Sequence, residues 1–255
     1  MTAAAVIRAR LRALANPTIA AHSARFFKTG PGEYGAGDRF LGIRVPDVRR
    51  VAREFHAAPL RTALALLRSP LHEERLLALV LLVARFERGG DRERAEIYAH
   101  YRKHTPRYVN NWDLVDTSAA PIVGAYLEPR DRGPLYELAR SPSLWERRVA
   151  IIATFAYIKK RSFADALAIT ELLLADREDL IQKAVGWMLR EVGNRDLAAL
   201  ERFLCKHYAG MPRTMLRYAI ERLPERRRKA YLAGKVSKGR LRSGLSTRAA
   251  RGYSV

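Results

Sequence analysis

Apolar residues recur at three- and four-residue spacing through almost the whole chain, and this period is the strongest constraint on its fold. It is the period of an α-helix, and no segment alternates convincingly with the two-residue period of a strand. Glycine and proline separate the periodic segments. Helices are therefore predicted over 49–56, 73–86, 92–101, 145–157, 163–174, 180–192 and 197–208.

The predicted helices form pairs that recur at intervals of roughly 35–45 residues, within the range of helical repeats. This pattern predicts an all-α, HEAT-like helical-repeat solenoid with a concave surface, and a compact helical bundle is the alternative. Residues 1–233 would form one domain, with a glycine-rich loop over 29–40. Residues 234–255 are basic and rich in Gly, Ser and Arg, which predicts a disordered tail that binds phosphate or is simply solvated.

The net charge of +21 gives a sequence pI of about 10.8. A field of this strength recruits polyanions, so a nucleic acid is the favoured partner and the concave face should carry the positive charge. A membrane surface, an acidic protein, a solubility device and the Arg and Ala bias of a GC-rich genome are the alternatives.

The single cysteine, Cys205, excludes an internal disulfide and indicates a reducing compartment. No apolar run has the length of a signal sequence or membrane span, so we expect a soluble, monomeric, cytoplasmic and nucleoid-associated protein. The six histidines do not cluster, and HExxH, CxxC and GxxxxGKS patterns are absent. The sequence therefore implies no metal and no cofactor.

Trp112 and Asp116 are four residues apart, so on a helix they share a face and can meet one ligand. Asp113 on the same turn leaves the choice of acid open. The alternative is a core tryptophan beside a salt-bridged aspartate.

Trp187 follows Lys183 by four residues and precedes Arg190 by three, which places cations beside an indole. A buried tryptophan that fills the core is the alternative. Arg147 and Arg148 point about 100° apart on a helix, so only one of them needs to face a nucleic acid.

Three motifs carry a family resemblance: Asn111–Asp116, Leu144–Ile151 and Ile181–Glu191. With Phe40–Ile43 and the following Val45-Pro46, they resemble the bacterial AlkD-type DNA alkylation-repair glycosylases from about residue 5 to residue 230. The resemblance implies a HEAT-like solenoid that wraps duplex DNA. It also implies hydrolysis of the N-glycosidic bond of alkylated purines such as 3-methyladenine and 7-methylguanine, without base flipping.

The same resemblance implies roles for several candidate residues. Asp116 would be the catalytic carboxylate, Trp112 and Trp187 would contact deoxyribose and backbone, and Arg148 would hold phosphate. From the residues themselves we expect further DNA contacts, which are Arg147, Lys183, Arg190 and Phe26. Phe26 stands where characterised relatives have a tyrosine and so lacks a hydroxyl that could bond phosphate or water.

The proposed chemistry agrees with these residue types. A cationic purine is already a good leaving group, and a carboxylate can stabilise the positive charge that develops on the deoxyribose. A non-catalytic DNA-binding module for distorted or branched DNA is the alternative, although such a module has little use for a carboxylate near phosphate. A protein-binding scaffold is disfavoured by the charge.

Overall fold

The computed structural model describes residues 2–236, and every regular element in that range is helical. Extended pairing in this part of the chain is limited to one isolated bridge between Arg39 and Leu71. The all-α prediction is confirmed, whereas the repeat solenoid, its positive concave face and the domain limit at residue 233 stay predictions. Most of the predicted basic tail, residues 237–255, lies outside the described residues.

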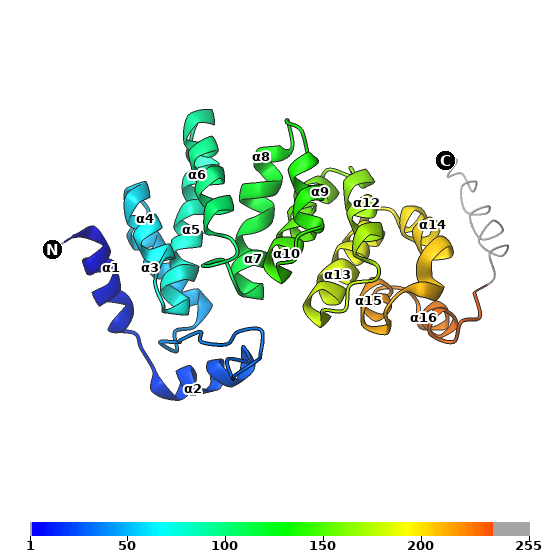
Figure 1. The fold of residues 1–255 in the computed structure, drawn as a ribbon, viewed down its shortest axis with the longest axis horizontal. Coiled ribbons are helices and arrows are strands. Elements are labelled where there is room, and N and C mark those ends of the chain that lie inside the picture. Colours follow the sequence, from blue (N-terminus) through cyan, green and yellow to red (C-terminus); the bar gives the residue numbers. More distant parts are fainter. Residues whose placement is uncertain (1, 237–255) are drawn as a thin grey trace, which may run out of the picture. The chain divides into compact units, whose positions relative to one another are not determined.

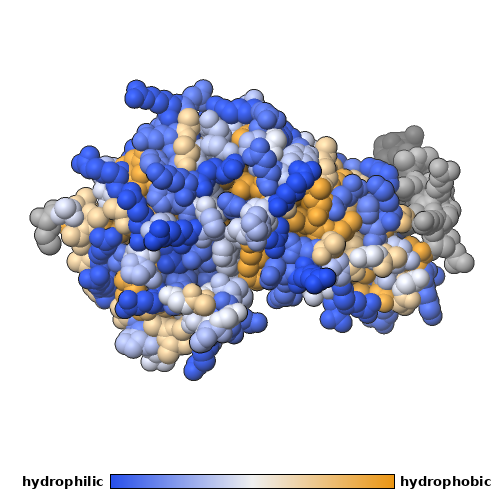
Figure 2. Space-filling model, in the orientation of Figure 1, coloured by the Kyte–Doolittle hydropathy of each residue, from blue (hydrophilic) through white to orange (hydrophobic). Residues whose placement is uncertain are grey.

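The chain divides into two compact units, Met1–Tyr157 and Ile158–Val255. On the face shown in Figure 2, hydrophilic residues cover most of the surface of each unit and apolar residues show through in patches. Within residues 2–236, no helix is both long enough and apolar enough to cross a membrane.

The first unit contains helices that follow one another in chain order (Figure 1). They are α1 (Ala3–Arg12), α2 (Pro17–Phe26), α3 (Val45–Glu54), α4 (Leu60–Leu67), α5 (His72–Arg88), α6 (Asp91–His104), α7 (Trp112–Ser118), the π-helical turn η1 (Ala119–Gly124), α8 (Ala125–Leu127), α9 (Gly133–Ala139) and α10 (Leu144–Ala153). α5 packs against α3 and α7, and α7 packs against α10. This succession of contacts places α7 inside the unit, between α5 and α10.

The predicted helix over 145–157 is interrupted, which is a difference from the sequence-based expectation. α10 ends at Ala153, and a short α11 (Phe155–Lys159) follows. Thr154 causes the break, because its backbone N–H and its hydroxyl both bond to the Ile151 carbonyl oxygen, at 3.2 and 2.7 Å. The start of α10 is as expected, since the Ser143 hydroxyl accepts the Glu146 N–H.

The loop between α2 and α3 is held in place by α5. The Glu73 carboxylate is 3% exposed and accepts backbone N–H groups of Leu41, Gly42 and Ile43 at 2.8–3.1 Å. Three charge-assisted hydrogen bonds explain why a carboxylate is tolerated in this interior. They also tie α5 to the segment 41–43, which directly follows the glycine-rich loop over 29–40, a loop as predicted.

The second unit is built around its longest helix. Its elements are α12 (Ala164–Leu173), α13 (Asp179–Arg195), α14 (Leu197–His207), the 3₁₀ turn η2 (Tyr208–Gly210), α15 (Arg213–Ala219) and α16 (Glu225–Leu232). α13 packs against α12, α14 and α15. Trp187 lies on this central helix and is half-buried.

Candidate functional site

α7 carries Trp112, Asp113 and Asp116 and begins at a built cap. The Asn111 side-chain oxygen accepts the Trp112 N–H at 2.9 Å, and Asn111 is fully buried. Its amide nitrogen donates to Asp38 at 3.2 Å, which joins the cap to the glycine-rich loop. The backbone N–H of Trp112 is therefore held by Asn111, and Asn111 is itself held by Asp38. As a result, the side chain of Trp112 projects from a defined position.

The Trp112 indole rests on aromatic residues of the α2 end. Its ring stacks on Phe27 with a centroid distance of 5.2 Å and an interplanar angle of 13°. Phe26 meets the same indole edge-on at 6.0 Å and is 59% exposed. Trp112 is half-buried, so part of the indole stays accessible to a ligand. The predicted site residues Phe26 and Trp112 thus lie together.

Asp116 and Arg148 form a bidentate ion pair between α7 and α10. Arg148 Nε donates to Asp116 Oδ1 at 2.9 Å, and Nη2 donates to Oδ2 at 2.8 Å. The arginine side chain is 5% exposed and that of the aspartate is 18% exposed. This geometry fixes both carboxylate oxygens while leaving one side of the aspartate accessible. Arg148, which the sequence predicts to hold phosphate, is a direct neighbour of the predicted catalytic acid.

The pKa of Asp116 is raised above its usual value. Burial disfavours the ionised carboxylate and is the largest cause, and the nearby Asp113 charge adds to it. The Coulomb attraction and hydrogen bonds of Arg148 act in the opposite direction without cancelling the shift. Asp116 is therefore a stronger proton acceptor than an exposed aspartate.

Asp113 belongs to a second, separate set of interactions, which we call the buried ion chain: Arg75, Asp38, His72 and Asp113. His72 Nε2 bonds to Asp113 Oδ2 and Nδ1 bonds to Asp38 Oδ2, both at 2.8 Å. Arg75 Nη2 donates to Asp38 Oδ1 at 2.8 Å. The chain joins the glycine-rich loop, α5 and α7.

His72 is the buried centre of this chain, with 2% exposure. Burial by itself lowers the pKa of its imidazole, but the charges and hydrogen bonds of Asp113 and Asp38 outweigh burial and raise the pKa to about 9. The ring also stacks on Phe40 at a centroid distance of 4.5 Å. At neutral pH His72 is an imidazolium that bridges two carboxylates.

The remaining predicted cation of this unit, Arg147, is engaged with backbone. Its Nη1 donates to the carbonyl oxygens of Ser141 and Pro142 at 3.0 and 2.9 Å. Those bonds hold the turn that precedes α10. Of the two neighbouring arginines, Arg148 is the one that joins the candidate acid.

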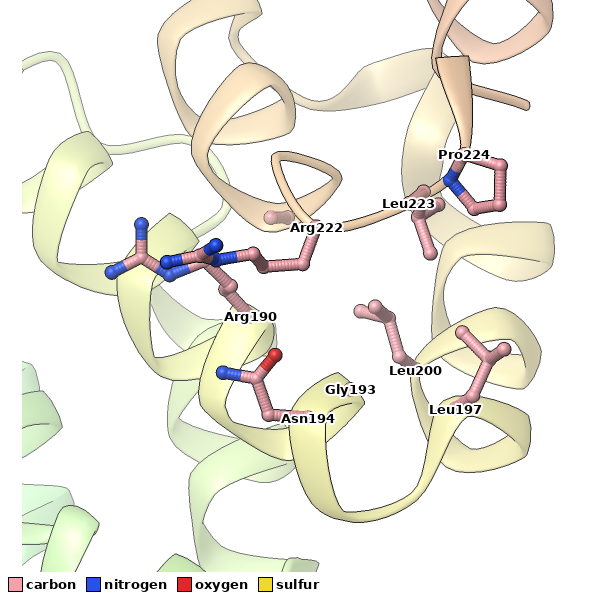
Figure 3. A pocket seen from close by; sticks show the side chains of 9 residues that line it. Arg190, Gly193, Asn194, Leu197, Leu200, Arg222, Leu223 and Pro224 are labelled. Carbon is pink, nitrogen blue, oxygen red and sulfur yellow. The ribbon is translucent and has the colours of Figure 1, made fainter. Parts of the chain in front are cut away.

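The second unit carries the other predicted residues, Trp187, Lys183 and Arg190, all on α13. Lys183 pairs with Asp179 at 2.6 Å, and Arg190 pairs with Glu221. Figure 3 shows Arg190 and Arg222 on one side of a pocket of about 130 Å³, with Leu200 and Leu223 on the other. The DNA contacts assigned to these three residues stay predictions.

Sequence reasoning missed Phe27, Phe40, His72 and Asp38, which support Trp112 and Asp113. A signal was present in the run His72-Glu73-Glu74-Arg75, four consecutive ionisable residues that open α5. All four are buried. Within residues 2–236, no group of three or more His, Cys, Asp and Glu side chains has the arrangement of a metal site.

Comparison with known proteins gives one family and one fold. The family model described as "DNA alkylation repair enzyme" matches residues 7–223. A solved structure described as a predicted DNA alkylation repair enzyme from Enterococcus faecalis superposes with a TM-score of 0.65 and 20% sequence identity, covering 83% of this chain and 97% of that one. No functionally curated protein sequence matches significantly.

Proposed function

The chain belongs to the DNA alkylation repair enzyme family, and on that premise we propose that it is a DNA glycosylase. Its substrate would be duplex DNA with cationic alkylated purines of the 3-methyladenine and 7-methylguanine type, and the lesion would stay stacked during the reaction. The observation that carries this proposal is Asp116: a mostly buried carboxylate, fixed by Arg148, one helical turn from an accessible indole.

The bond that breaks joins C1′ of the deoxyribose to the purine nitrogen. Its electron pair leaves with the base, which becomes neutral, and positive charge develops on the sugar. The Asp116 carboxylate stabilises that charge because both its oxygens are already oriented and most of the side chain is shielded from solvent. Water then bonds to C1′, and its proton passes to Asp116, whose raised pKa favours this transfer.

Trp112 and Arg148 have supporting parts in this proposal. The indole face contributes cation–π stabilisation of the sugar, worth about 0.5–2 kcal/mol. Arg148 acts as a positioning residue for Asp116 through its two hydrogen bonds. Because the guanidinium keeps Asp116 ionised against the effect of burial, it also preserves the form of the acid that the reaction needs.

Base release from DNA treated with N-methyl-N-nitrosourea tests the proposal. Free 3-methyladenine and 7-methylguanine should accumulate above the spontaneous rate, as resolved by chromatography. Neutral O⁶-methylguanine in the same DNA is the internal control and should stay in the polymer, since it lacks leaving-group activation. No release by folded protein that still binds duplex DNA would indicate the non-catalytic binding module instead.

A further inference from the structure

The first unit carries a second concave site, which we call the arginine pocket. It has a volume of about 240 Å³ and lies between the glycine-rich loop, the turn before α5 and the segment before α7. Its walls are Ala36, Gly37, Asp38, Arg68, Ser69, Pro70, Arg75, Arg107, Tyr108 and Asn110. Three of these residues are arginines and one is an acid, so positive charge exceeds negative charge in the wall.

The one carboxylate of the pocket is already saturated. Asp38 Oδ1 accepts from Arg75 Nη2 and from the Arg39 backbone N–H, at 2.8 and 3.0 Å. Oδ2 accepts from His72 and from Asn111, at 2.8 and 3.2 Å. Four hydrogen bonds fill its acceptor sites. Asp38 therefore has no oxygen left for the other two arginines of the wall.

Those two arginines, Arg68 and Arg107, are exposed and have no ion pair with any described residue. Arg107 lies over the Tyr108 ring at 5.4 Å, which limits the positions of its guanidinium. Gly37 has a φ of +80°, and its backbone N–H has no acceptor in the described part of the chain. Two free guanidinium groups and a free N–H thus border one cavity.

We propose that the arginine pocket binds a phosphoryl group. Guanidinium donors match the oxygen geometry of phosphate, and they keep their charge at every physiological pH. The cavity is several times the volume of a water molecule, about 30 Å³, so a hydrated phosphate has room. The source of the group is a backbone phosphate of the bound duplex, a step that rests on the function proposed above.

The arginine pocket lies directly beside the start of α7 in the sequence and shares residues with the buried ion chain. The wall segment ends at Asn110, directly before the Asn111 cap and Trp112. Asp38 and Arg75 belong both to the wall and to the buried ion chain that ends at Asp113. A phosphate held here would therefore be placed in a fixed relation to α7. It would set the register of the duplex without reading its sequence.

The double variant Arg68→Gln/Arg107→Gln tests the pocket against the control Arg49→Gln/Arg61→Gln. All four arginines are exposed residues of the first unit, and both variants lose two charges. Binding to an undamaged duplex is measured over a range of salt concentrations. The pocket variant should lower the log–log slope by about 0.9, the value for one phosphate contact, and the control by much less. Equal changes would exclude a backbone phosphate of the duplex as the occupant, and excision plays no part in this measurement.

A second arm identifies the source of the phosphoryl group. Single methylphosphonates, which remove one backbone charge, are placed along the duplex. At one position, the methylphosphonate should weaken duplex binding by the wild type and by the control variant. The same methylphosphonate should leave binding by the pocket variant unchanged, as a double-mutant cycle requires. If no position does so while inorganic phosphate raises the melting temperature of the wild type and not of the pocket variant, the ligand is a free phosphate. Failure of both readouts overturns the site.

Discussion

Asp113 and Asp116 lie three residues apart on α7, yet the protein holds them in two different ways. Both carboxylate oxygens of Asp116 accept hydrogen bonds from the permanently charged guanidinium of Arg148, and 18% of the Asp116 side chain is exposed. Asp113 bonds through Oδ2 to the imidazole of His72, and its Oδ1 has no hydrogen-bond partner among the described residues. One helix thus presents two acids in two environments.

The two acids fasten α7 to different neighbours. His72 connects Asp113 to Asp38 and so fastens α7 to the glycine-rich loop. Asp116 fastens α7 to α10, but it keeps an exposed side and a raised pKa. Solvent exposure does not separate the two acids, since 18% of the Asp116 side chain and 15% of the Asp113 side chain are exposed. The choice between them as the reacting acid stays a prediction, for which we propose Asp116.

The largest effect is expected on stability, from Arg148→Met. Loss of one partner leaves the Asp116 charge buried without compensation, which should lower the free energy of unfolding by about 3–5 kcal/mol. Urea denaturation measures this change. Arg147→Met is the matched control on the same helix, and it should cost about 1 kcal/mol because it removes hydrogen bonds from Arg147 to the carbonyl oxygens of Ser141 and Pro142. Similar losses for both variants would mean that the Asp116 pair is not a special contact.

Next in size is the effect of Asp116→Asn on excision. The single-turnover rate should fall by about 10²–10³-fold, since an oriented charge that stabilises the transition state is removed. Affinity for undamaged duplex should stay equal or improve slightly, because the carboxylate repels phosphates. Asp113→Asn is the comparison and should lower the rate less. The reverse ranking would assign the catalytic role to Asp113.

The helices were predictable from local sequence, whereas the contacts of the site were not. Apolar spacing located α5 and α13, and Ser143 indicated the start of α10. His72, however, finds Asp38 and Asp113 at separations of 34 and 41 residues. Periodicity reports which face of a helix is buried and contains nothing about such distant partners. For the same reason the pairing of Asp116 with Arg148, 32 residues away, appears only in the structure.

The pH dependence of the free energy of unfolding tests the environment of Asp113, which is set by His72. Because the folded pKa of His72 is raised from 6.5 to about 9, its contribution is fully present below pH 6.5 and is lost as pH rises through 9. The wild-type free energy of unfolding should fall across this window by up to about 3 kcal/mol relative to His72→Gln. Denaturation at a series of pH values gives the difference. A constant difference would show that His72 is not charged in the native state.

The smallest effect is expected from Phe26→Tyr. Phe26 is 59% exposed and touches the Trp112 indole with its ring edge, so an added hydroxyl meets solvent and needs no rearrangement. Stability should change by about 0.5 kcal/mol or less. If the hydroxyl reaches a phosphate or a water at the lesion, excision rises by about tenfold at most, the value of one hydrogen bond. Single-turnover kinetics with the wild type alongside decide this, and a fall in rate would show that the bare ring is the better contact.

Gly124 gives the Asp116–Arg148 pair a dependence on a residue that touches neither partner. A Cβ at this position would lie 2.2 Å from the Ala153 carbonyl oxygen and 2.8 Å from the Ala156 Cβ. The end of η1 therefore approaches the end of α10 backbone to backbone. Because Gly124 has no side chain, these two backbone segments can lie in contact. Their spacing sets how closely Asp116 and Arg148 can approach each other. A transfer of this ion pair to another scaffold therefore requires Gly124 as well as Asp116 and Arg148.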